Sequence, residues 1–146
     1  AAARPAVSRL RSAAAGAVAA TTWAAVEPID TRVARWDYSD VALLGKAVTR
    51  SRAWPVAGLA VHCANGVVFG LAYEEVRRRT RLGPRRVALG LALAEHLTLY
   101  PLAALVDRRH PARGGPGLAP MWSARGFALE TWRHALFGAV LGRLAG

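Results

Sequence analysis

Two stretches of the chain, HCANGVVFG at residues 62–70 and HALFGAVLG at residues 134–142, place a histidine and two glycines at intervals of four residues. Each stretch lies inside a long apolar segment. Four residues advance an α-helix by slightly more than one turn, so each set forms a stripe on one helix face. Small residues at this spacing allow another helix, or a flat cofactor, to approach the backbone. The stripes therefore predict two helices that each have one closely contacted face.

The composition favours a membrane environment for these helices. The chain has 146 residues, 53% of them hydrophobic, and its mean hydropathy is +0.20 although its formal net charge is +11. The stretches from Ala53 to Tyr73 and from Val87 to Val106 contain no formal charge except Glu95, and each is long enough to cross a bilayer. The arginines form no stripe interleaved with aromatic residues, so nucleic acid is not an expected partner.

We predict an all-α integral membrane protein with a single domain over residues 1–146. Membrane helices are expected at about residues 10–27, 54–75, 86–106 and 126–145, with a short interfacial helix at about residues 40–50. The first of these helices is short and alanine-rich, and the last contains Glu130 and Arg133. Both therefore need protein neighbours, which a four-helix bundle provides.

The orientation follows from the arginines between the second and third helices. This short connection contains six of them, which the positive-inside rule places in the cytoplasm together with both termini. The protein is then expected in the bacterial cytoplasmic (inner) membrane as a multi-pass protein. Counted over the whole sequence, however, lysine and arginine divide equally between the two sides, so a dual-topology dimer is an alternative. The six residues are Arg77, Arg78, Arg79, Arg81, Arg85 and Arg86.

The equal offset between the two stripes indicates an internal duplication. In a four-helix arrangement the second and fourth helices run in the same direction, as do the first and third. The chain would then consist of two αα-hairpins related as a parallel pseudo-repeat. Sequence agreement is poor in the first and third helices, so the prediction depends on the two stripes.

The stripes allow two interpretations. His62 and His134 lie at the same expected depth, about 12 Å below the outer boundary. They are placed to be the axial ligands of a haem b, with Gly66 and Gly138 admitting the porphyrin ring. Alternatively, the glycines serve only to pack helices, and the histidines form hydrogen bonds across the helix interfaces. We prefer packing, because the spacing alone does not require a cofactor.

A metal site is a further alternative. Histidine and carboxylate side chains on neighbouring helices of a bundle supply the ligands that transition metals prefer. The duplicated Glu-x-x-His pattern of di-iron bundles is absent, however. The candidate ligands are His62, His96, Glu130 and His134, with Glu27 as a possible addition.

Other polar residues are expected to have structural roles. Asn65, Glu95 and Tyr100 lie within predicted spans and should be buried, because a polar group in the bilayer interior is costly unless it has partners. A group of acidic residues near the outer side should form a solvated face paired with nearby arginines. These acidic residues are Glu27, Asp30, Asp37, Asp40 and Asp107.

The sequence contains no motif of a hydrolase or a phosphate-binding loop, and its single cysteine, Cys63, excludes an intrachain disulfide. We therefore expect a protein without enzymatic activity. The preferred function is that of an accessory or structural subunit that packs against other membrane subunits, or a second copy, through its glycine-rich faces. The alternatives are a haem b electron-transfer protein with two histidine ligands, and a small transporter or channel that uses the mid-membrane carboxylate of Glu95.

Overall fold

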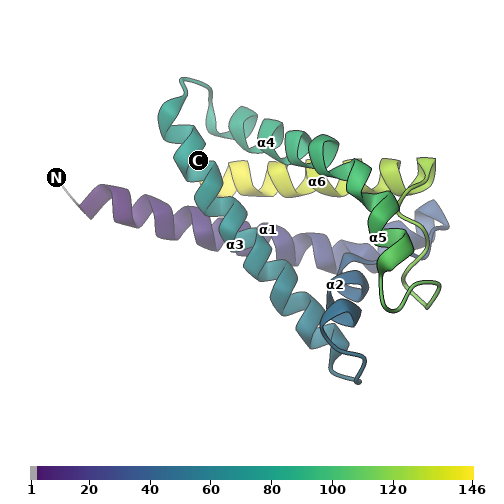
Figure 1. The fold of residues 1–146 in the computed structure, drawn as a ribbon. Helices are drawn as coiled ribbons and strands as arrows, with labels where there is room; N and C mark the ends of the chain where they lie inside the picture. Colours follow the sequence, from purple (N-terminus) through teal and green to yellow (C-terminus); the bar gives the residue numbers. More distant parts are fainter. Residues whose placement is uncertain (1–2) are drawn as a thin grey trace.

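The computed structural model describes residues 3–146, with side chains from Ser8 onward, and this part of the chain is all-helical (Figure 1). Extended pairing within it is limited to an isolated bridge between Tyr38 and Leu118. The all-α prediction is therefore confirmed for the described residues. The elements are α1 (Ala3–Ala34), α2 (Asp40–Val48), α3 (Trp54–Arg79), α4 (Pro84–Leu99), the 3-10 turn η1 (Tyr100–Leu102), α5 (Ala103–Arg109) and α6 (Ala124–Leu144).

Helix α1 is longer than the sequence predicts. A span was expected at about residues 10–27, but the helix covers Ala3–Ala34 and continues through Pro28. A proline inside a helix removes a backbone donor and usually ends or kinks the helix. The turn beyond Pro28 carries Asp30, which binds Arg133 of α6, and this contact explains why the helix continues.

The third predicted helix is interrupted. The segment expected as one helix at about residues 86–106 consists of α4, the turn η1 and α5. Pro101 lies in η1 and cannot donate the backbone hydrogen bond that an α-helix needs. The chain therefore tightens into a 3-10 turn before α5 begins.

Two segments are long and apolar enough to cross a membrane, namely Trp54–Arg79 and Pro84–Arg109. The most apolar window of each has a mean hydropathy of 1.5, yet only 28% and 17% of these windows are buried inside the protein. A core helix of a soluble domain would bury most of such a window. Here the apolar side chains of both segments largely face outward.

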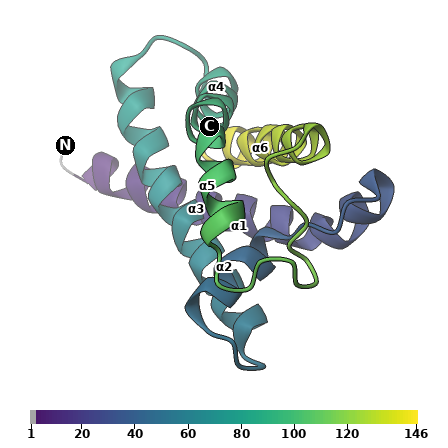
Figure 2. The same ribbon diagram turned by 45° about the vertical axis from the view of Figure 1, so that its right-hand side comes forward.

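The main helices form two hairpins (Figures 1 and 2). α1 packs most extensively on α3, and α4 packs on α6, while contacts between α1 and α6 join the two pairs. In Figure 1, α1 and α4 run from left to right, and α3 and α6 return. α2 packs against α3, whereas α3 makes few contacts with α4 and leans away from it below their connecting loop. The α3–α4 side of the molecule is therefore less tightly packed than the α1–α6 side.

Each glycine stripe is covered by the helix that precedes it in its own hairpin. A Cβ atom added to Gly66 of α3 would lie 2.4 Å from the carbonyl oxygen of Gly16 in α1. On α6, a Cβ atom added to Gly138 would lie 2.8 Å from the Cα atom of Leu89 in α4. Both distances are too short for a real side chain, so the glycines permit direct contact between helix backbones.

Two glutamates stabilise the arginine-rich end of α3. Glu74 is buried and accepts hydrogen bonds from the hydroxyl groups of Ser8 and Ser12 of α1, both at 2.9 Å. Glu75 is more exposed and forms ion pairs with neighbouring arginines of α3. The N-terminal half of α1 is thus fixed to the C-terminal end of α3.

The close contact at Gly66 predicts opposite effects for two glycine-to-alanine substitutions. Alanine in a helix interior is favoured over glycine by about 1 kcal/mol. Gly90→Ala in α4 should therefore stabilise the protein, because an added Cβ atom meets nothing within 4 Å. Gly66→Ala should lower the free energy of unfolding by about 1–3 kcal/mol, because it overpacks the α1–α3 contact. Denaturation of both variants in the same detergent checks this, and equal effects of the two substitutions would contradict the packing described.

Candidate buried charge cluster and cavity

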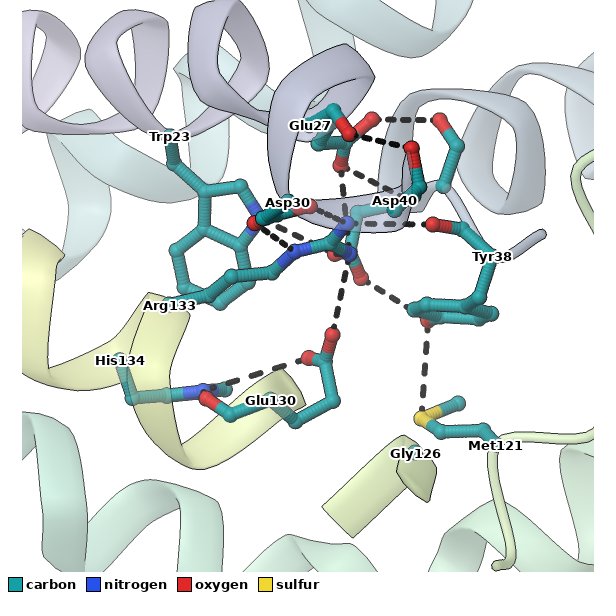
Figure 3. Close-up of polar contacts among 12 residues, drawn as sticks. Trp23, Glu27, Asp30, Tyr38, Asp40, Met121, Gly126, Glu130, Arg133 and His134 are labelled. Atoms are coloured by element: carbon teal, nitrogen blue, oxygen red, sulfur yellow. Dashed lines mark hydrogen bonds and ion pairs between the residues drawn. The ribbon is translucent and has the colours of Figure 1, made fainter. Parts of the chain in front are cut away.

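Arg133 of α6 is the centre of a buried polar cluster (Figure 3). Its side chain is 0% exposed. Leu129, Arg133 and Phe137 are all buried and follow one another at intervals of one helical turn, so Arg133 occupies a core position on this face of α6. A buried guanidinium without partners would cost several kcal/mol, so the surrounding side chains must compensate its charge.

Carboxylates from α1 and α2 bind this guanidinium. Asp30 of α1 forms a two-point contact, with 2.7 Å between Nη2 and Oδ1 and 3.0 Å between Nε and Oδ2. Asp40, the first residue of α2, accepts a hydrogen bond from Nη1 at 3.0 Å. Nη2 also donates to the backbone carbonyl of Tyr38 at 3.1 Å. Arg133 therefore joins α6 to α1, to α2 and to the segment between them.

Two glutamates complete the cluster and give it an excess of acid. Glu130 Oε1 lies 3.2 Å from Nη1 of Arg133, and Glu27 Oε1 lies 3.8 Å from the same atom. Glu27 also accepts hydrogen bonds from the Ser39 hydroxyl and, at 2.8 Å, from the backbone N–H of Asp40. Four carboxyl groups thus surround one guanidinium. Like charges repel strongly in a buried site, so this environment favours additional positive charge, in the form of protons or a bound cation.

Neutral donors orient Asp40 within the cluster. The Tyr38 hydroxyl donates to Asp40 Oδ1 at 2.9 Å, and the indole N–H of Trp23 donates to Oδ2 at 3.0 Å. Burial raises the pKa of Tyr38 well above its usual value, and the negative charge of Asp40 adds to this shift. The phenol therefore stays protonated, and remains a donor, throughout the physiological pH range.

Trp23 links the cluster to two of the predicted histidines. Its ring makes edge contacts with His62 of α3, at 5.3 Å between ring centroids, and with His134 of α6, at 4.7 Å. The structure thus brings His62 and His134 to the same region of the fold. An indole is in contact with both of their rings.

His134 also contacts α4. Its Nδ1 lies 2.7 Å from the backbone carbonyl of Glu130, and because a carbonyl only accepts, this nitrogen carries the proton. Its Nε2 lies 3.9 Å from the carboxylate of Glu95. The ring packs beside that of His96, at 4.7 Å between centroids, and His96 Nε2 lies 2.9 Å from the Thr131 hydroxyl. His96 is therefore held by α6, while His134 Nε2 faces Glu95.

A cavity of about 190 Å³ lies beside this cluster. Its lining includes Trp23 of α1, His62 and Asn65 of α3, Glu95 of α4 and His134 of α6. His62 is buried, and its Nε2 has no hydrogen-bond partner in the part of the chain that the structure describes. The cavity thus brings together polar groups from both hairpins in the middle of otherwise apolar helices.

The prediction that Asn65 and Glu95 are buried is wrong. Asn65 is exposed, and the side chain of Glu95 is 42% exposed. The physical reason is that α3 leans away from α4, so these two residues line the cavity instead of a packed helix interface. Tyr100 is half-buried, and its hydroxyl donates to the backbone carbonyl of Met121 at 2.7 Å.

The prediction of a solvated acidic face is also wrong for three of its residues. Glu27 and Asp30 are buried and Asp40 is half-buried, and all three lie beside Arg133. The expected surface arginines are not their partners, because Arg133 provides a buried one. Asp107 lies at the end of α5 and accepts hydrogen bonds from two backbone N–H groups of the following loop.

The geometry gives little support to the cofactor and metal hypotheses. Gly66 and Gly138 lie against helix backbones, which occupy the space that a porphyrin ring would need. The proposed metal ligands also do not form a site. In the described part of the chain, no three histidine, cysteine, aspartate or glutamate side chains are placed to hold a metal ion.

Sequence reasoning missed the most important residue of this site, Arg133, although one signal was available. Arg133 shares the spacing of Leu129 and Phe137, so an amphipathic reading of α6 would have placed it on the core face. Its principal partner, Asp30, lies in another helix far along the chain, and no local pattern joins the two residues.

No protein-family model, no curated protein and no solved structure matches this chain.

The cluster predicts that two arginines of α6 contribute very differently to the free energy of unfolding. Arg133→Gln should lower the free energy of unfolding by about 3–5 kcal/mol, because it leaves buried carboxylates without their counterion. Arg143→Gln, near the end of the same helix and exposed, should change it by less than about 0.5 kcal/mol. Denaturation of the purified variants measures both values. A stable Arg133→Gln protein would show that the cluster does not hold the fold together.

Proposed function

We propose that the chain is a multi-pass protein of the bacterial cytoplasmic membrane, built as a four-helix bundle. α1, α3, the α4–α5 segment and α6 are its four spans, and α2 lies at the interface. The proposal is supported by the two apolar segments, whose side chains largely face outward. α1 and α6 carry four of the five charged residues of the cluster, and these helices pack on each other, on α3 and on α4.

The topology we propose has both termini and the α3–α4 loop in the cytoplasm, because that loop contains the densest group of arginines. The two hairpins would be copies of one ancestral hairpin. This duplication is supported by the equivalent positions of the two glycine stripes, each of which lies against the preceding helix.

Insertion and topology can be tested with single cysteines introduced after Cys63→Ser. A cysteine at Arg81, in the α3–α4 loop, should be protected from a membrane-impermeant thiol reagent in intact cells. A cysteine at Gly114, in the loop between α5 and α6, should react. Reaction at both positions in one preparation would indicate dual topology, and extraction of the protein from membranes by alkaline carbonate would contradict insertion.

For function we propose a small, non-enzymatic transporter or channel that admits a proton or a small cation to the middle of the bilayer. The observation that supports this most is the position of Glu95. It is an exposed carboxylate in the middle of an apolar segment, and it lines a cavity beside a cluster that already holds an excess of acid. A carboxylate placed there is costly in a membrane and marks an ion or proton pathway.

A second proposal is the accessory subunit expected from the sequence, but with a contact surface other than the glycine stripes. The glycine stripes are filled by helices of the same chain and offer no surface to a partner. The outward-facing apolar sides of α3 and α4 are the surface that a partner or a second copy would use. This function requires no flux through the protein, so the following measurement separates it from transport.

Transport predicts a proton flux that depends on Glu95. The purified chain is reconstituted into liposomes that contain a pH-sensitive dye, and a potassium diffusion potential is applied. Wild-type protein should acidify the vesicle interior faster than protein-free liposomes do, and Glu95→Gln should remove most of this flux. The control is Glu75→Gln, which removes a carboxylate at the arginine-rich end of α3, outside the cavity, and should retain the flux. An equal flux for Glu95→Gln and wild type would contradict the proposal.

A further inference from the structure

The cavity between the hairpins contains hydrogen-bond acceptors that lack donors. The proton of His134 is on Nδ1, where it is donated to the Glu130 carbonyl, so the neutral ring has a lone pair on Nε2. This lone pair faces Glu95, whose carboxylate is 3.9 Å away and can only accept. Two acceptors at this distance cannot bond to each other. Their arrangement calls for a donor from outside the chain, placed between them.

His62 provides a third such group. In the tautomer with the proton on Nδ1, Nε2 is the free acceptor of the neutral ring. His62 Nε2 is buried, has no hydrogen-bond partner among the described residues, and belongs to a side chain that lines the same cavity. Leaving a buried polar atom without a partner is unfavourable, so a ligand that donates to it gains affinity.

Three aromatic rings form part of the remaining cavity wall. Trp23, Phe69 and Phe137 line it, and their rings pack on one another with centroid distances of 5.1 Å for Phe69–Phe137 and 6.3 Å for Trp23–Phe137. Aromatic faces attract organic cations through their quadrupoles. They also accommodate the apolar body of a ligand.

Size limits the ligand further. A cavity of about 190 Å³ is slightly larger than the engineered cavity of about 150 Å³ that holds benzene. The ligand is therefore a small molecule with a body of about one ring or a short alkyl chain.

From these features we propose that the cavity binds a small primary ammonium ion. Its N–H groups donate to Glu95, to His134 Nε2 and to His62 Nε2, and its apolar part lies against Trp23 and the two phenylalanines. The positive charge compensates the excess of acid around Arg133. The inference rests on the membrane placement proposed above but does not require transport. The same chemistry is offered by a free amine and by an ethanolamine lipid headgroup, which the test distinguishes.

The probe is benzylamine, which is protonated at neutral pH, and its neutral analogue of the same size is benzyl alcohol. The full chain is placed in nanodiscs of phosphatidylcholine and phosphatidylglycerol, and each probe is titrated by calorimetry. Benzylamine should bind saturably, and benzyl alcohol at least tenfold more weakly, because it lacks the charge and two of the three donors. In nanodiscs that also contain phosphatidylethanolamine, unchanged affinity assigns the site to a free amine, whereas competition assigns it to the lipid headgroup.

Two variants test the assigned contacts. Glu95→Gln keeps the shape of the side chain and should weaken benzylamine at least tenfold while leaving benzyl alcohol unchanged. His62→Phe keeps an aromatic ring, removes the free nitrogen and should weaken benzylamine about threefold or more. Glu75→Gln should bind like wild type. Since the side chain of Glu95 is 42% exposed and its approach to His134 Nε2 is 3.9 Å, Glu95→Gln should fold normally even if His62→Phe does not.

The inference is overturned if wild-type protein does not bind benzylamine, if the alcohol binds equally well, or if Glu95→Gln binds the amine as tightly as wild type. Ammonium binding and transport can fail independently, and the measurements distinguish the two failures. Amine binding without proton flux contradicts transport alone. Glu95-dependent proton flux without amine binding contradicts this inference alone.

Discussion

The fold depends on compensating one buried charge. Arg133 lies on the core face of α6, where the same helical spacing otherwise places leucine and phenylalanine. A guanidinium in this position requires carboxylates that are themselves fixed, and they come from both ends of the α1–α2 connection. Meeting this requirement extends α1 beyond Pro28, orients the start of α2 and attaches the first hairpin to α6. The glycine contacts then bring the helices of each hairpin together.

The same cluster gives the cavity its chemical character. More carboxyl groups surround Arg133 than one guanidinium can neutralise, and the adjacent cavity contains a further carboxylate on Glu95 and the free ring nitrogen of His62. In a low-dielectric environment these groups favour a proton or a cation. The loose packing between α3 and α4 leaves this region open between two otherwise apolar segments. Transport and ammonium binding are proposed from this combination of negative charge, unpaired acceptors and an accessible cavity.

The local features of the chain could be predicted from its sequence, whereas the site could not. The apolar runs around residues 62 and 134 predict helices, and the glycine spacing predicts one closely packed face on each, because both are properties of a single helix. The contact between Asp30 and Arg133 joins distant segments and has no local pattern. No sequence pattern indicates that α3 leans away from α4. Because it does, Asn65 and Glu95 are exposed rather than buried. The histidines were identified as candidates, but their common neighbour, Trp23, was not.

Asp30 and Arg133 hold α1 and α6 together as a pair, and a double-mutant cycle measures the coupling between them. The free energies of unfolding are measured for wild type, Asp30→Asn, Arg133→Gln and the double variant in one detergent. We expect the double variant to be clearly less destabilised than the sum of the two single effects, with a coupling energy of about 1.5–3 kcal/mol. Additive effects, with a coupling near zero, would contradict it.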